Sequence, residues 1–291
     1  MPEPSYATER LLRVEVRALR VRLASVRAVR ASRWGFLGSC LSVADVLAVL
    51  AERLRLAGPG EETPDHDRLV LSKGHAAPAL YAAVTGWRGD GSYAAPGSPY
   101  QGHPNLSFLP AAGMTSGSLG LAVPAAAGSP RARAARRRGA RRRGPGRRRT
   151  PVRHRPGGDP VGGPRRSAQR PVRRGRQRPP VRWRRPPADA TRRMLSAAAP
   201  AFAAVDGHDA ARLDDAIGTL LGAAAGPAVL WAATTRGKGV PAVEERPVPM
   251  SWIPDDAVLA AAEEHLTEAL RRACDRLARP VTGPAVPGRS S

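Results

Sequence analysis

The feature that most constrains the fold is the stretch LSKGHAAPALYAAVTG, residues 71–86. The short apolar run at 69–71 predicts a buried strand, residues 72–74 favour a turn, and Pro78 fits only the first turn of the helix that follows. Ligands of α/β proteins collect where strands end and helices begin, because free backbone N–H groups lie there. His75 is therefore a candidate site residue, although a histidine at a glycine turn is more often solvated or structural.

Four other stretches follow residues 71–86 along the chain. They are YQGHPNL at 100–106, GMTSGSLGLAVPAAAG at 113–128, VDGHDAARLDDAI at 205–217 and TTRGKGVPAVEE at 234–245. Together with DRLVLSKGHAAPALYA at 67–82, they resemble the cofactor-binding N-terminal part of transketolases. The resemblance implies an α/β protein with the three-layer thiamine diphosphate-binding fold and a parallel sheet.

The resemblance also implies roles for particular residues. His75 and His103 would line the cofactor or substrate site as catalytic candidates, and Gly117, Ser118 and Leu119 would contact thiamine diphosphate. From the residues alone, the small-residue turn at 115–120 is equally compatible with ligand binding and with a plain helix cap. Transketolases move a two-carbon ketol unit between sugar phosphates and use a glutamate from a second domain. We therefore expect a separate C-terminal subunit, a hetero-oligomer and a sugar phosphate substrate.

The sequence departs from the family pattern at several positions. Phe36 stands where transketolases have a histidine, Ile253 follows Trp252 where they have a Trp-His pair, and Pro124 falls inside an expected helix. In the family, a GDG motif and a later asparagine that hold Mg²⁺ fall in the interval that corresponds to residues 129–188, and no such pair is found there. Asp159 lies among arginines and prolines, so no metal ligand is predicted. These departures predict weak or no thiamine diphosphate binding and put activity of the chain as written in doubt.

Positive charge is concentrated in one segment. The chain has a formal net charge of +23, and residues 129–188 hold about 23 arginines against one acidic residue, which leaves the remainder near +1. This composition predicts a disordered segment over 129–190, because too little apolar surface is available to offset the entropy of ordering. Such a segment would bind nucleic acid nonspecifically through its charge.

Three interpretations of this segment and of the chain remain open. The favoured one is a coding sequence read out of frame, since Arg, Pro, Gly and Ala are what GC-rich DNA then encodes, and the segment contains no lysine. The second is a genuine basic insertion in a noncatalytic RNA-binding protein. The third is a thiamine diphosphate-dependent relative acting on another acyl or sugar substrate. Sequencing the DNA that encodes residues 125–195 discriminates the first from the others.

The rest of the chain has ordinary globular composition. We expect residues 1–128 and 191–278 to form one cofactor-binding domain, and the tail at 279–291 to be disordered. A surface helix is predicted over 7–31 with its arginines solvated, a second helix over 42–56 capped by Ser42, and a last helix over 254–277. Asp209 is placed to cap a helix through residue 221, and residues 226–235 contain a short buried strand.

Cysteine usage and hydropathy bear on the compartment. Cys40 and Cys274 are far apart and lack the spacing of a disulfide framework or a zinc site. No apolar run is long enough for a membrane span, and arginines interrupt the N-terminal stretch where a signal peptide would be apolar. A reducing, cytoplasmic setting without membrane association is therefore expected.

Overall fold

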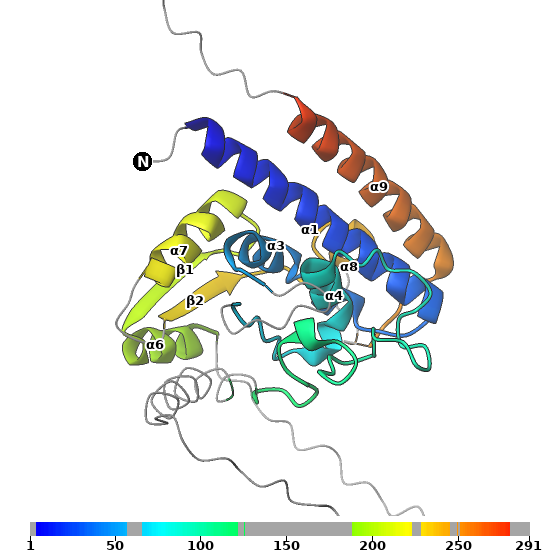
Figure 1. Ribbon diagram of the computed structural model, residues 1–291, viewed down its shortest axis with the longest axis horizontal. Helices are drawn as coiled ribbons and strands as arrows, with labels where there is room; N and C mark the ends of the chain where they lie inside the picture. The colour runs from blue at the N-terminus through cyan, green and yellow to red at the C-terminus, as the bar shows by residue number, and fades with distance from the viewer. Residues whose placement is uncertain are drawn as a thin grey trace, which may run out of the picture.

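The computed structural model describes residues 4–56, 66–121, 125, 188–222, 228–244, 249 and 251–279. In chain order its helices and strands are α1 (Pro4–Ser32), α2 (Leu37–Leu41), α3 (Ala44–Arg53), η1 (Gly74–Ala76), α4 (Ala77–Thr85), η2 (Pro110–Ala112), α6 (Ala188–Ala198), β1 (Ala201–Asp206), α7 (Ala210–Gly222), β2 (Ala228–Ala233), α8 (Pro241–Glu244) and α9 (Asp256–Ala278). Figure 1 shows the long helices α1 and α9 side by side and the short sheet beside α3. The predicted disorder of 129–187 and 280–291 falls outside the described residues, and residues 188–190 are helical in α6.

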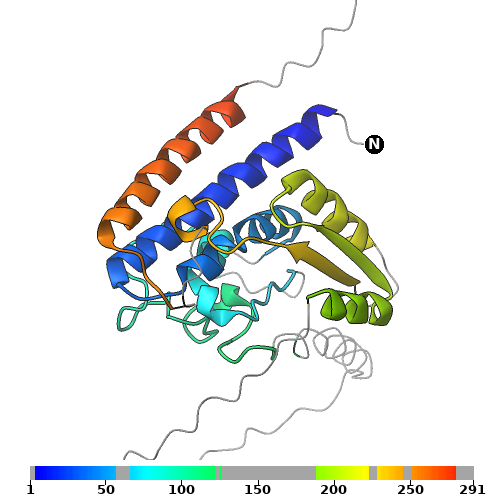
Figure 2. The ribbon, with the colours of Figure 1, turned by 180° about the vertical axis from the view of Figure 1, so that it is seen from behind.

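Helix α1 is the central element of the fold. It packs against α9, α3, α4, α2 and α7, and both views show α9 running alongside it (Figures 1 and 2). Val16, Leu23 and Val26 are buried on one side of this helix, but so are Val14 and Val21 on other faces. The prediction of a surface helix is therefore wrong, because neighbours cover it on several sides.

The arginines of α1 explain why the sequence predicted a surface helix. Arg22 is almost fully buried and forms an ion pair with Asp45 of α3. Arg17 binds Glu52 at 2.7 Å, and Arg27 binds Glu263 of α9 at 2.8 Å. The guanidinium groups thus reach carboxylates on neighbouring helices while their aliphatic stems cover apolar surface. A solvated arginine face is the wrong description of this helix.

The sheet has two parallel strands among the described residues. Strand β1 pairs with β2 from Ala201 opposite Ala228 to Asp206 opposite Ala233. Helices α7 and α6 contact both strands and lie on opposite faces of the sheet in Figures 1 and 2, which makes three layers. The predicted parallel α/β arrangement is confirmed at this end of the molecule.

Several local predictions can be compared with the structure directly. Asp209 caps α7, since its carboxylate accepts the Arg212 N–H at 3.0 Å. Pro78 occupies the first turn of α4, as predicted. Residues 69–71 are not a strand, because no strand pairs with them within the described part of the chain. The helix predicted over 42–56 begins instead at Ala44, and Ser42 does not cap it.

Within the described residues, no helix has the length and apolar character that crossing a membrane requires.

Candidate functional site

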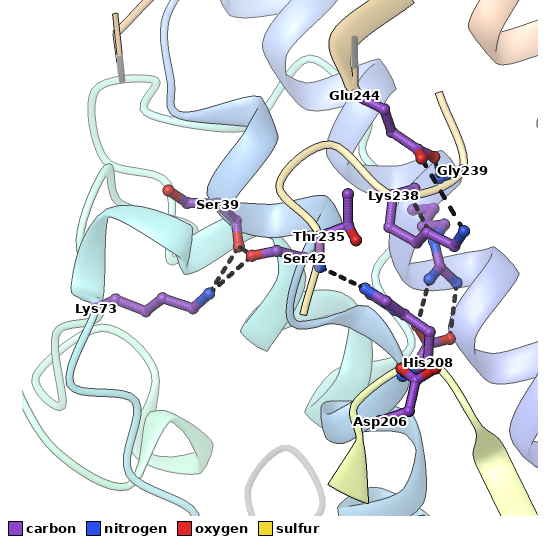
Figure 3. Close-up of polar contacts among 11 residues, drawn as sticks. Ser39, Ser42, Lys73, Asp206, His208, Thr235, Lys238, Gly239 and Glu244 are labelled. Atoms are coloured by element: carbon purple, nitrogen blue, oxygen red, sulfur yellow. Dashed lines mark hydrogen bonds and ion pairs between the residues drawn. The ribbon is translucent and has the colours of Figure 1, made fainter. Parts of the chain in front are cut away.

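The short helix α2 contacts residues 72–75, which we call the Gly-His corner. The Lys73 ammonium donates to the Ser39 carbonyl oxygen and to the Ser42 hydroxyl, both at 3.1 Å (Figure 3). His75 Nε2 lies 3.1 Å from the Ser39 hydroxyl. Ser39 and Ser42 therefore position both basic side chains of the corner.

Burial shifts the pKa of three groups in this region. It lowers the pKa of Lys73, whose ammonium has serine oxygens and, among the described residues, no carboxylate as its hydrogen-bond partners. The pKa of His75 is also lowered, first by burial and then by the charges of Lys73 and His103. Burial raises the pKa of the Cys40 thiol to about 11, so this cysteine is an inert core residue.

The serine-bearing turn at 115–119 closes against the Gly-His corner. A Cβ on Gly74 would lie 2.8 Å from Ser116 Oγ and 2.9 Å from the Ser116 carbonyl oxygen, so only glycine permits this approach. The Ser116 hydroxyl is buried and has no hydrogen-bond partner among the described residues. The His103 ring lies 3.9 Å from the position that a Cβ on Gly117 would occupy.

A hollow of about 590 Å³ opens beside this turn. It is lined by Trp34, Ala94, Thr115, Ser116 and residues 101–105. One aromatic contact belongs to its wall, where Trp34 lies edge-on to His103 with ring centroids 6.2 Å apart. Outside the lining, Phe36 lies edge-on to His75 with ring centroids 4.9 Å apart. Phe36 therefore packs against the histidine of the corner and offers a bound molecule no polar group.

A second loop, residues 234–239, reaches α2 from the opposite side. The Arg236 side chain lies over Gly38, where an added Cβ would be 2.6 Å from the guanidinium Nε. The Gly237 N–H donates to the Gly38 carbonyl oxygen at 3.2 Å. The Lys238 ammonium lies 4.0 Å from a carboxylate oxygen of Glu244.

His208 holds this loop in place with both of its ring nitrogens. The Thr235 N–H donates to Nε2 at 2.7 Å, so the ring proton is on Nδ1, which donates to Asp45 at 2.7 Å (Figure 3). Asp45 also receives two bonds from Arg22. The network connects α1 and α3 with the carboxyl ends of both strands.

The structure brings together most of the residues that the sequence singled out. His75, His103 and Gly117 lie around the same corner, and Ser118 and Leu119 follow in the exposed part of the turn. The helix predicted to follow this turn lies mostly outside the described residues. No group of three or more His, Cys, Asp or Glu side chains within the described ranges is arranged to hold a metal.

Sequence reasoning missed the residues that build the support of the site. Ser39 and Ser42 lie in the glycine-rich stretch GFLGSCLS, where the sequence predicted only a helix cap, at Ser42. Asp45 was not singled out from the sequence as a site residue, and it binds His208 and Arg22. Ser116 was within the singled-out turn, but the sequence gave no signal that its hydroxyl would be buried.

The surroundings of His75 predict a measurable pH dependence. Burial and the Lys73 charge lower the pKa of His75, so the folded protein favours the neutral ring. The contribution of the neutral ring to stability is fully present at pH values above the pKa of histidine in the unfolded chain, near 6.5. Stability should then decrease as pH falls from 6.5 and stop changing below the folded pKa. We expect Lys73→Met to raise the pKa of His75 in an NMR titration assigned with His75→Gln. An unchanged pKa would mean that Lys73 does not act on the ring.

The comparisons with known proteins agree with this geometry. Residues 14–147 match the sequence model of a family described as "Transketolase, thiamine diphosphate binding domain". The transketolase-like protein 2 of Bos taurus is 43% identical over 124 residues, which are 38% of this chain and 18% of that protein. Human transketolase is 46% identical over 66 residues, 22% of this chain and 11% of its own length. The chain thus matches only a small part of these relatives.

A bacterial relative and a solved structure extend the comparison. The 6-deoxy-6-sulfo-D-fructose transketolase subunit SqwG of Clostridium sp. (strain MSTE9) is 40% identical over 101 residues, 32% of this chain and 36% of that protein. The crystal structure of Pichia stipitis transketolase with sedoheptulose-7-phosphate superimposes with a TM-score of 0.54 at 17% identity, covering 91% of this chain and 46% of that one. The α/β fold of transketolases is therefore confirmed. Residues 14–147 are thus similar in sequence to the thiamine diphosphate binding domain of transketolases, and the chain shares their fold.

Proposed function

We propose that this chain binds thiamine diphosphate at the corner formed by residues 72–75 and 115–119, as part of a transketolase-like enzyme. The carrying observation is the close approach of Gly74 to Ser116, which places His75 and His103 around one corner. The unpartnered hydroxyl of Ser116 fits a bound polar molecule, because buried polar groups normally have a hydrogen-bond partner.

The residues of this chain suit an anionic cofactor. Lys73 uses two of its three N–H donors on Ser39 and Ser42, which leaves one for a phosphate oxygen. The turn at 117–119 offers exposed backbone close to His103. When bound, thiamine diphosphate supplies the nucleophilic carbon that accepts a two-carbon ketol unit. His75 and His103 would hold or move protons on the bound sugar phosphate.

Magnesium fits this site less well than the organic cofactor does. The described residues contain no cluster of metal ligands, and the interval in which transketolases carry their GDG motif lies outside them. The described residues therefore offer the diphosphate cationic and backbone donors but no cluster of metal ligands. This is the physical reason to expect weak binding.

The partner and substrate are part of the same proposal. We infer a separate C-terminal subunit, a hetero-oligomer and ketol transfer between sugar phosphates. The name of the Clostridium relative, which describes it as a subunit, supports this. Phe36 stands where transketolases have a histidine. This difference favours, as the second candidate function, a relative that acts on another acyl or sugar substrate. The arginines at 129–188 would add only nonspecific attraction for nucleic acid.

A titration with thiamine diphosphate and MgCl₂ tests the proposal. We expect saturable but weak binding, with a dissociation constant well above about 1 µM, and NMR shifts confined to the corner. His103→Ala should weaken binding by about fivefold, the effect of one hydrogen bond of about 1 kcal/mol. His265→Ala on the exposed side of α9 is the matched control and should change nothing.

Two results would contradict parts of the proposal. Micromolar affinity would show that the absent metal motif does not limit binding. Shifts spread over many arginines, or equal losses in both histidine variants, would show attraction by charge and no built site.

A further inference from the structure

We propose that a cavity between α1, the end of α4 and α9 binds a small amphipathic dianion, a phosphate monoester with an aliphatic body. The cavity has a volume of about 460 Å³, within the range of small-molecule sites. Figures 1 and 2 show α9 and α1 side by side, and α4 packs on α1 as well. The cavity is separate from the corner that contains His75, and the inference does not depend on the proposed function.

Arginines form the polar wall of this cavity. Five of them line it: Arg13, Arg17, Arg20, Arg27 and Arg88. The four on α1 recur at intervals of four, three and seven residues, which places them along one side of the helix. Glu52 is the one acidic residue in the lining.

Three of the five arginines are neutralised within the protein. Arg17 binds Glu52 at 2.7 Å, and Arg27 binds Glu263 at 2.8 Å. Arg13 forms ion pairs with Glu9 and Glu52. Their guanidinium groups are held in place by these partners and do not require a ligand.

Arg20 and Arg88 are the two that remain. Both are exposed, and neither has an acidic partner among the described residues. They come from different elements, α1 and the segment after α4, and meet at one cavity. With the ion-pair partners Glu9, Glu52 and Glu263 counted, two positive charges are left at the cavity, which matches the charge of a phosphate monoester above its second pKa near 6.

The floor of the cavity is apolar. It is formed by Val16, Leu23, Ala24, Ala82, Trp87, Leu270 and Leu277. Val16 and Leu23 are seven residues apart on α1, a distance of about 10 Å along the axis. A chain of about eight carbons would cover this floor while its phosphate meets the two arginines. Inorganic phosphate, in contrast, would leave the apolar surface exposed to water.

Octyl phosphate, used below its micelle concentration, is the probe, and Trp87 is the reporter. The full chain is labelled with 5-fluorotryptophan, and Trp87→Phe identifies the resonance of Trp87 among the five tryptophans. We expect octyl phosphate to shift this resonance saturably and inorganic phosphate at equal concentration to leave it unchanged. The Arg20→Gln/Arg88→Gln double variant should bind at least about tenfold more weakly, since both charged contacts are lost.

The control keeps the net charge of the double variant. Arg192→Gln/Arg193→Gln removes two exposed arginines from α6, outside the cavity, and should bind octyl phosphate like the unaltered chain. Urea denaturation verifies that both double variants remain folded, which is expected for exposed side chains. Equal weakening in the two variants, an unshifted Trp87 resonance, or equally tight binding of inorganic phosphate would each overturn the inference.

Discussion

Asp214→Ala is expected to lower the free energy of unfolding by about 3 kcal/mol. The Asp214 carboxylate is almost fully buried on α7 and binds Arg10 of α1 and Arg53 of α3, the latter at 2.6 Å. Removing it leaves two guanidinium groups side by side, each only about one fifth exposed. The loss of a buried partner costs more than the loss of a surface ion pair, because the remaining charges stay desolvated.

The neighbouring residue provides the control for this prediction. Asp215 is exposed on the same helix, so Asp215→Ala should change stability by no more than about 0.5 kcal/mol. Urea unfolding followed by circular dichroism measures both, and the slope against urea concentration should be unchanged. A loss below about 1 kcal/mol for Asp214→Ala would mean that water compensates the two arginines.

Gly89→Ala should destabilise the protein by about 3 kcal/mol or more. Gly89 has φ +78°, and an added Cβ would lie 2.2 Å from the Ala24 carbonyl oxygen of α1. The substitution therefore adds backbone strain of about 1–2 kcal/mol and also forces the segment away from α1. Neither cost can be relieved by a side-chain movement, because the contacting atoms belong to the backbone.

Gly97→Ala separates the two costs. Gly97 has nearly the same dihedral, φ +76°, but nothing lies within 4 Å of an added Cβ. Gly97→Ala should lower the free energy of unfolding only by the cost of the backbone strain, about 1–2 kcal/mol. The difference between the two midpoints of thermal unfolding then measures the close approach alone. Equal losses would show that the chain at Gly89 moves away from α1 without cost.

Elements with strong local signals were predictable from the sequence. Pro78 fixed the start of α4, Asp209 the start of α7, and the apolar run after Pro227 the strand β2. The last helix was predicted at 254–277 and is observed as Asp256–Ala278. In each case a capping residue, a proline or a periodic apolar pattern lies within the element itself.

The unpredicted features depend on partners far away in the chain. The burial of α1 required knowing that Arg22 would meet Asp45 and that Arg27 would meet Glu263, 236 residues later. The strand expected at 69–71 had the right composition, but a strand also needs a neighbour, and none pairs with it among the described residues. Composition within a window contains neither kind of information.

The candidate site also has a part that the sequence predicted and a part that it did not. His75, His103 and the turn at 117–119 were singled out from motifs, and the structure places them around one corner. Their support was not predictable, since a serine in a glycine-rich turn has no pattern that distinguishes it from an ordinary loop residue. The role of Ser39 depends on the fold, which brings Lys73 and His75 within hydrogen-bond distance of it.

The packing of α1 against α9 determines what holds the two parts of the polypeptide together. Residues before 121 and after 188 share one apolar cluster, in which Leu23 and Val26 meet Leu259 and Leu266. A second cluster, of Val14, Ala18, Ala48 and Val49 with Leu213 and Ile217, also draws on both parts, so each part covers apolar surface of the other. Severing the peptide chain between the parts would leave a noncovalent pair, because interdigitated side chains and not the covalent connection keep them joined.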